Sequence, residues 1–253
     1  MIKHFIFHVM LLAGICSPLK EDLQHVTVYL IGDSTMSIKE VKAYPETGWG
    51  MPFAYFFDST VTVDNRAKNG RSTRTFIAED RWRPILETLQ PGDYVFIQFG
   101  HNDESKEKTD RYTTPEQYTA NLEKFVNEAR TKQAYPVLLT PVSRRSFDSA
   151  GKVKETHAAY AALVKAVAAK LQVPLIDLNE SSKALYQSFG PVYSKLLFLQ
   201  LAPNEHPNYP LGKNDNTHFN ELGARMIAQL VLNDMRNLQL PLTKRIVVSQ
   251  QKL

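Results

Sequence analysis

The sequence contains little cysteine and no long hydrophobic segment. Cys16 is the single cysteine among 253 residues, which excludes an internal disulfide, a multi-cysteine metal site and a CxxC redox pair. An apolar run from Phe5 to Cys16, interrupted only by His8, is shorter than the about 20 residues that a membrane-spanning helix needs. The sequence therefore excludes a disulfide-stapled fold and predicts no stable membrane span.

Strong charge and glycine-rich nucleotide motifs are also missing. The 30 basic and 26 acidic side chains leave a net charge of +4, which is compatible with an acidic partner but does not require one. Neither GxGxxG nor GxxxxGK[ST] occurs, and nothing indicates a nucleic-acid partner. With 43% hydrophobic and 22% charged residues, the composition is that of an ordinary globular protein whose oligomeric state stays open.

The amino terminus has the pattern of an export signal. Lys3 precedes the apolar run, and Ser17 and several charged residues follow it. This order predicts a signal peptide over residues 1–17 and a secreted or periplasmic protein, with an apolar first helix as the alternative. A lipoprotein signal has a small residue before its cysteine and leucine three positions before it. Ile15 and Ala13 occupy those positions, which disfavours lipid anchoring.

Strand-like and helix-like patterns alternate after about residue 25. The expected strands are β-branched or apolar runs next to turn residues, and they cover Val26 to Ile31, Val61 to Asn65, Tyr94 to Phe99, Val137 to Thr140 and Val173 to Leu178. Near-continuous apolar strands are typical of a parallel sheet that is buried on both faces.

Amphipathic helices are predicted between these strands and after them. Thr114 and Gln117 form a capping-box pattern, and Asn220 can cap the last helix. The three expected apolar stripes are Tyr118, Leu122, Phe125, Val126 and Ala129; Val153, Tyr160, Val164, Val167 and Leu171; and Leu222, Met226, Ile227, Leu230 and Val231. Repeated strand–helix units predict one three-layer, doubly wound α/β domain over 25–240, followed by a tail over 241–253.

One long segment lacks a clear pattern. Residues 190–216 contain four prolines and no sustained periodicity. So long an irregular segment in a compact domain is usually a functional loop, and loops at the rim of a site shape its substrate preference.

Four polar clusters stand where ligands bind in such a fold. Ligands of an open parallel sheet bind beyond the carboxyl ends of the strands. Three clusters, Gly32 to Ser37, Asn69 to Ser72 and Gly100 to Asp103, follow the first three strands, and a fourth, Asp215 to His218, is expected at the start of the last helix. Each cluster alone also fits a purely structural role, as a helix cap, a turn, a polar loop or a solvated ion pair.

Together the clusters supply the parts that acyl transfer needs. Ser34 can be the nucleophile, His218 the base that removes its proton, and Asp215 the group that orients the imidazole. The backbone N–H groups of Ser34 and Gly70 and the side-chain amide of Asn102 can bind the oxyanion. Glycine at position 70 would let the backbone approach a substrate closely.

These blocks resemble those of the GDSL, or SGNH, hydrolase superfamily. Four motifs are similar to those of its rhamnogalacturonan acetylesterase branch: GDSTM (32–36), NGRST (69–73), FGHND (99–103) and DNTHFNELGA (215–224). Thr35 replaces the leucine of the superfamily's name, as it does in that branch. The resemblance implies a flavodoxin-like α/β/α fold with a five-stranded parallel sheet, no metal or organic cofactor, and removal of acetyl groups from the pectic polysaccharide rhamnogalacturonan.

The resemblance also assigns roles to residues. It implies Ser34 as nucleophile, Asp215 and His218 as its partners, and Ser34, Gly70 and Asn102 as oxyanion donors.

The substrate has several candidate identities. Arg71 and Arg74 stand beside the proposed oxyanion loop and could bind galacturonate carboxylates, or they could be solvated or pair with acidic side chains of the protein itself. An acetylesterase acting on xylan or another polysaccharide, a lipase or thioesterase of the same superfamily, and a non-catalytic carbohydrate-binding protein are the alternatives.

Overall fold

The computed structural model describes residues 24–247. The helices are α1 (Gly50–Phe53), α2 (Thr73–Ala78), α3 (Arg83–Thr88), α4 (Pro115–Thr131), α5 (Ala158–Leu171), α6 (Leu178–Tyr193) and α7 (Glu221–Asn237). The strands are β1 (Val26–Gly32), β2 (Val61–Asn65), β3 (Tyr94–Gln98), β4 (Tyr135–Leu139), β5 (Leu175–Ile176), β6 (Phe198–Leu201) and β7 (Lys213–Phe219).

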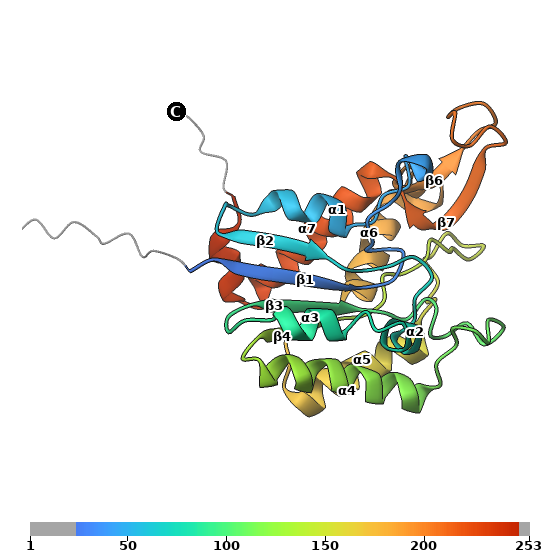
Figure 1. Ribbon diagram of the computed structural model, residues 1–253. Coiled ribbons are helices and arrows are strands. Elements are labelled where there is room, and N and C mark those ends of the chain that lie inside the picture. Colours follow the sequence, from blue (N-terminus) through green and yellow to red (C-terminus); the bar gives the residue numbers. More distant parts are fainter. Residues whose placement is uncertain (1–23, 248–253) are drawn as a thin grey trace, which may run out of the picture.

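Five of these strands form one parallel sheet in the order β2-β1-β3-β4-β5. Helices lie on both of its faces, and β6 and β7 lie beyond the end to which the strands point (Figure 1). The predicted flavodoxin-like, three-layer α/β fold with a five-stranded parallel sheet is confirmed. The fifth strand is shorter than the sequence predicts, because Pro174 has no N–H to donate and α6 already begins at Leu178.

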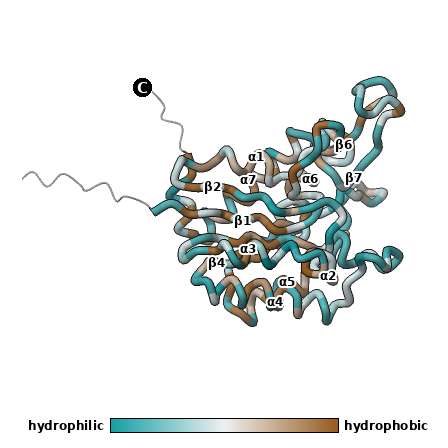
Figure 2. Tube along the Cα trace, in the orientation of Figure 1, coloured by the Kyte–Doolittle hydropathy of each residue, from teal (hydrophilic) through white to brown (hydrophobic). Residues whose placement is uncertain are grey.

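Alternation along the central strands divides the interior into two cores. In β1, Val28 and Leu30 pack on one side of the sheet, whereas Tyr29 and Ile31 pack on the other. Strand β3 follows the same pattern, and all five of its residues are buried. Strand β2 lies at the edge of the sheet, and its residues are only partly buried or exposed. The apolar colouring accordingly follows the central strands, and the outer loops are hydrophilic (Figure 2).

Two groups of helices close these cores. Side chains of α1, α6 and α7 belong to the core on one face, and those of α2, α3, α4 and α5 belong to the other. The capping box of α4 is confirmed, because Thr114 accepts from the N–H of Gln117 and the Gln117 side chain accepts from that of Thr114. All five predicted stripe residues of α4 are buried.

The other two predicted stripes are right only in part. Val153 lies before α5, which begins at Ala158, and it pairs with Phe147 across a turn instead of continuing the helix. Leu222 is 49% exposed, because the first turn of α7 buries Gly223 and its neighbour Ala224 instead. Asn220 caps α7 as predicted, by accepting from the N–H of Gly223.

The segment expected to be an irregular loop contains regular structure. Residues 190–216 include the end of α6, a short 3-10 helix over Ser194–Leu197, and β6, which pairs antiparallel with β7. Asp215 and His218 lie on β7 and not at the start of the last helix. Periodicity missed this ribbon because β6 has only four residues, the pairing is bulged, and β7 is largely polar.

The segment expected to begin a carboxyl-terminal tail contacts the domain. Residues 241–247, assigned to a tail, pack on the domain: Leu242 and Ile246 are buried and Ile246 pairs with Phe57. The predicted signal peptide over residues 1–17 lies outside the described residues. Within residues 24–247 no helix is both long and apolar enough to cross a membrane.

Candidate active site

Ser34 and His218 meet although they are far apart in the sequence. Ser34 lies two residues beyond the end of β1, and its Oγ lies 2.8 Å from Nε2 of His218 on β7. The serine is 9% exposed and the histidine side chain 27%, so the pair is largely covered but still reaches solvent. The ribbon of β6 and β7 therefore carries an imidazole onto the turn that follows the first strand.

Asp215 orients that imidazole. Its Oδ2 lies 2.8 Å from His218 Nδ1, and its Oδ1 accepts from the backbone N–H groups of Thr217 and His218. Burial raises the pKa of Asp215, but the hydrogen bonds and charge of His218 outweigh burial and hold it well below its usual range. An ionised carboxylate only accepts, so Nδ1 carries the proton and Nε2 presents its lone pair to the Ser34 hydroxyl.

Gly70 and Asn102 lie on adjoining loops. Gly70 has φ of +75°, in the left-handed region that favours glycine. The Asn102 side chain is almost buried, and its Nδ2 donates to the Arg71 carbonyl at 3.0 Å. This bond uses one of its two amide hydrogens and leaves the other for a further acceptor. The amide of Asn102 is thus fixed beside the turn that contains Gly70.

The buried carboxylate of Asp33 stabilises the turn that contains Ser34. Asp33 Oδ1 accepts from the N–H and the hydroxyl of Thr35, and Oδ2 lies 3.2 Å from Nδ1 of His101. Burial raises the pKa of Asp33, but its interaction with His101 and the two donors of Thr35 hold that pKa well below its usual range. Burial and the neighbouring His157 lower the pKa of His101 to about 4, so its ring is neutral near pH 7.

Asp103, in the same block as His101 and Asn102, fixes the start of α2. Its Oδ1 accepts from the N–H and the hydroxyl of Thr73, at 2.9 and 2.6 Å. Burial raises the pKa of Asp103 to about 7, against the effect of the Thr73 donors. The loop after β3 therefore holds the helix that follows the Gly70 turn.

The two arginines expected to bind substrate are engaged with the protein. Arg71 pairs with Glu79 at 2.9 Å and donates to the carbonyl of Asn69. Arg74 donates to the backbone carbonyls of Tyr112 and Thr109 and so ties down the 105–114 loop. A role of either in binding a substrate carboxylate stays a prediction.

Sequence reasoning missed one residue that contacts this site. Lys39 is buried, and its Nζ donates to the Ser34 carbonyl and to the Asn69 side chain. The only signal was a charged residue five positions after the serine, which periodicity assigns to solvent.

No group of three or more side chains suited to hold a metal ion occurs within residues 24–247.

Comparison with known proteins places the chain in a family. The model of the GDSL-like lipase/acylhydrolase family matches residues 30–226. The chain belongs to this family of acylhydrolases. The matched region spans both Ser34 and the Asp215–His218 pair. The resemblance to GDSL hydrolases that the four sequence blocks indicate is confirmed.

Named relatives cover most of the chain. It is 44% identical over 227 residues to the rhamnogalacturonan acetylesterase RhgT of Bacillus subtilis, a match that covers 90% of this chain and 97% of RhgT. It is 37% identical to a probable rhamnogalacturonan acetylesterase, YesY, of the same organism, covering 87% of this chain and 97% of YesY. The crystal structure of Bacillus subtilis YxiM superposes with a TM-score of 0.74 at 26% identity, covering 87% of this chain and 58% of YxiM.

Proposed function

We propose that this protein is a serine esterase that removes acetyl groups from a pectic polysaccharide, rhamnogalacturonan, through an acetyl-enzyme intermediate. The observation that carries the proposal is the hydrogen-bonded chain from Ser34 through His218 to Asp215, beside Gly70 and Asn102. The identity to RhgT along almost the whole length of both chains supports the substrate.

The first half of the reaction transfers the acetyl group to the protein. His218 Nε2 takes the proton of Ser34 Oγ, and Oγ attacks the acetyl carbonyl carbon. The N–H groups of Ser34 and Gly70 and the free amide hydrogen of Asn102 stabilise the oxyanion. The bond between the carbonyl carbon and the sugar oxygen then breaks, and the imidazolium returns its proton to that oxygen.

The second half releases acetate. A water molecule takes the place of the sugar. His218 removes a proton from this water while the water oxygen attacks the acyl carbon. The ester bond to Ser34 breaks, and the serine oxygen regains a proton from His218. The ionised Asp215 stabilises the imidazolium in both halves, since its carboxylate stays charged at the pH of the reaction.

Acetate release from defined polysaccharides tests the proposal. The chain from residue 18 onward should release acetate from acetylated rhamnogalacturonan faster than from acetylated xylan, and Ser34→Ala should lower kcat by about 10⁶-fold. Ser59→Ala, at a serine remote from the site on the turn before β2, is a matched control. Near wild-type hydrolysis by Ser34→Ala would contradict the mechanism, and faster release from xylan would contradict the substrate.

Two further readouts separate the remaining alternatives. A lipase or thioesterase would prefer longer acyl chains in a series of 4-nitrophenyl esters, whereas an acetylesterase prefers the acetate. A non-catalytic binding protein would not be labelled by an organophosphonate, whereas the proposed esterase is labelled covalently at Ser34.

A further inference from the structure

Lys39 is a buried cation that contacts the turn of Ser34 and the turn of Gly70 at once. Its side chain is 2% exposed, and Nζ lies 2.5 Å from the carbonyl oxygen of Ser34 and 2.7 Å from Oδ1 of Asn69. Asn69 directly precedes Gly70, whose N–H faces the substrate in the proposed mechanism. One ammonium group therefore joins the backbone of the nucleophile to the loop of an oxyanion donor.

A second donor bridges the same two acceptors. The hydroxyl of Ser37 lies 2.5 Å from Oδ1 of Asn69 and 3.4 Å from the Ser34 carbonyl. Ser37 is also buried, so both bridges are shielded from water. Hydrogen bonds in such a shielded setting hold their partners in a fixed geometry more firmly than exposed ones.

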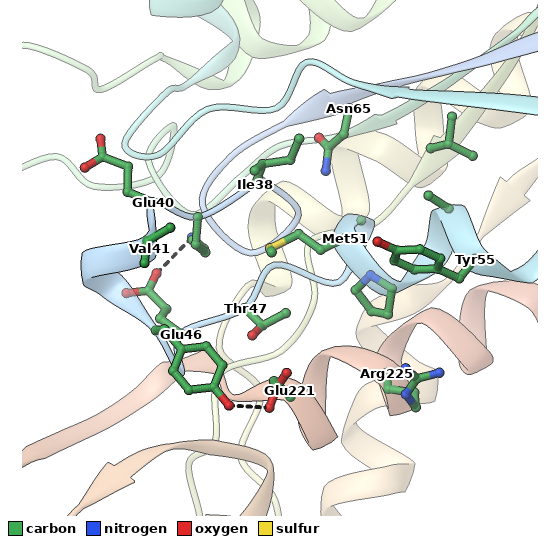
Figure 3. Close-up of a pocket in the computed structure, with 16 residues that line it drawn as sticks. Ile38, Glu40, Val41, Glu46, Thr47, Met51, Tyr55, Asn65, Glu221 and Arg225 are labelled. Carbon is green, nitrogen blue, oxygen red and sulfur yellow. Dashed lines mark hydrogen bonds and ion pairs between the residues drawn. The ribbon is translucent and has the colours of Figure 1, made fainter. Parts of the chain in front are cut away.

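Glu46 is the acidic partner of the lysine in this buried setting. Its Oε1 lies 2.8 Å from Nζ, and its own side chain is only 15% exposed. Lys39 and Glu46 both line a cavity of about 610 Å³ next to the site. Figure 3 shows Glu46 in the wall of this cavity. A buried ammonium without an anion is strongly disfavoured, so the pair explains how a lysine can occupy this position.

We propose that Lys39 is a positioning residue for the esterase reaction, which fixes the distance between the Ser34 nucleophile and the Gly70 oxyanion donor. It touches no reacting atom and acts through the Ser34 carbonyl and the Asn69 side chain. The inference rests on the proposed function, because it assigns Lys39 to the same site. Misplacement of reacting groups by about 1 Å can cost about 10²-fold in rate, which sets the scale of the expected effect.

Replacement of the lysine by an apolar side chain of similar length tests the proposal. Lys39→Met should lower kcat for 4-nitrophenyl acetate by about 10- to 100-fold and change KM by less than about threefold. The rate of Ser34 labelling by an organophosphonate should fall in proportion to kcat, because labelling needs the same nucleophile and oxyanion donors. Lys42→Met is the matched control, because Lys42 is 84% exposed on the same segment and should keep wild-type kcat.

A double variant separates positioning from a merely structural role. Lys39→Met alone leaves Glu46 without its cation, whereas Lys39→Met/Glu46→Gln removes both charges and is expected to unfold near the wild-type Tm. If Lys39 positions the site, the double variant keeps the loss of kcat while its Tm recovers. If kcat recovers together with Tm, the lysine only stabilises the fold and the proposal is overturned.

Other outcomes are equally decisive. A folded Lys39→Met protein with kcat within threefold of the wild type would overturn the inference. If neither lysine variant folds, Ser37→Ala decides, because Ser37 contacts the same two acceptors. A fall in kcat of threefold or more at constant KM supports positioning through these acceptors, and an unchanged kcat overturns it. Failure of the proposed function would show instead with Lys39 intact, as equal acetate release by the wild type and by Ser34→Ala.

Discussion

At the scale of single residues, the carboxylate of Asp215 determines which nitrogen of His218 faces Ser34. We expect Asp215→Asn to lower kcat by about 10³- to 10⁴-fold, since a neutral amide can donate to Nδ1 and so place the imidazole proton on Nε2. Steady-state hydrolysis of 4-nitrophenyl acetate measures the effect. Asp110→Asn, at an exposed aspartate, serves as control and should keep wild-type kcat. An Asp215→Asn enzyme within tenfold of the wild type would argue against the orienting role.

A second aspartate gives the stability of the protein a pH dependence. Burial raises the pKa of Asp103 to about 7 from an ordinary value of 3.8, so the folded state favours the protonated carboxyl. The stabilisation from this group is therefore complete below about pH 4 and is lost as the pH rises to about 7.

The variant Asp103→Asn tests this sign, because an amide stays neutral throughout. The Tm of the wild type minus that of Asp103→Asn should fall between about pH 4 and pH 7 and then level off, by an amount equivalent to a few kcal/mol in unfolding free energy. Thermal unfolding followed by circular dichroism at several pH values gives both curves. A difference that stays constant or rises over that interval would show that Asp103 is ionised in the folded protein.

At the scale of elements, the contact of α7 with the 3-10 helix at Ser194–Leu197 sets the position of the base. A Cβ built on Gly223 would lie 1.8 Å from the carbonyl oxygen of Leu197. The cap residue Asn220, two positions after His218, donates through Nδ2 to the carbonyls of Leu196 and Phe198. The close approach at Gly223 therefore holds the end of β7 against the segment before β6.

We expect Gly223→Ala to destabilise the protein by about 1–3 kcal/mol, because an added methyl group forces two packed backbones apart. Kcat should fall as well, since the shift reaches His218 through Asn220. Urea denaturation and ester hydrolysis measure the two effects. Gln229→Ala, on the exposed face of the same helix, should change neither, and a Gly223→Ala protein as stable as this control would show that the helix can move without cost.

Local patterns determined the elements best where they are regular and amphipathic. The capping box and the apolar stripe of α4 were predictable residue by residue, because a long helix on a core repeats a simple period. The ribbon of β6 and β7 was not, because a four-residue strand and a largely polar one are held by each other and by the helix packed behind them. Val153 shows the same limit, since its apolar side chain packs from a turn and not from a helix.

At the scale of the whole molecule, we propose that the protein is exported and loses its first 17 residues or so. Expressed with this segment in a bacterial host, it should be recovered outside the cytoplasm with a mature amino terminus near residue 18 and therefore without Cys16. Cell fractionation and mass spectrometry of the purified chain measure both points. Replacement of the apolar residues 9–12 by charged ones should retain the full-length protein in the cytoplasm. Full-length protein outside the cytoplasm would contradict cleavage.

The sequence by itself determined the parallel sheet, the acylhydrolase family and the residues proposed for the chemistry, because strand patterns and short polar blocks are local features. Only the tertiary structure decided how those blocks meet: Ser34 and His218 are 184 positions apart, and their contact depends on sheet order and on the packing of α7. It also decided that Lys39 is buried and that Arg71 and Arg74 are engaged with the protein, because the partner of a charged side chain is set by folding and not by its neighbours in the chain.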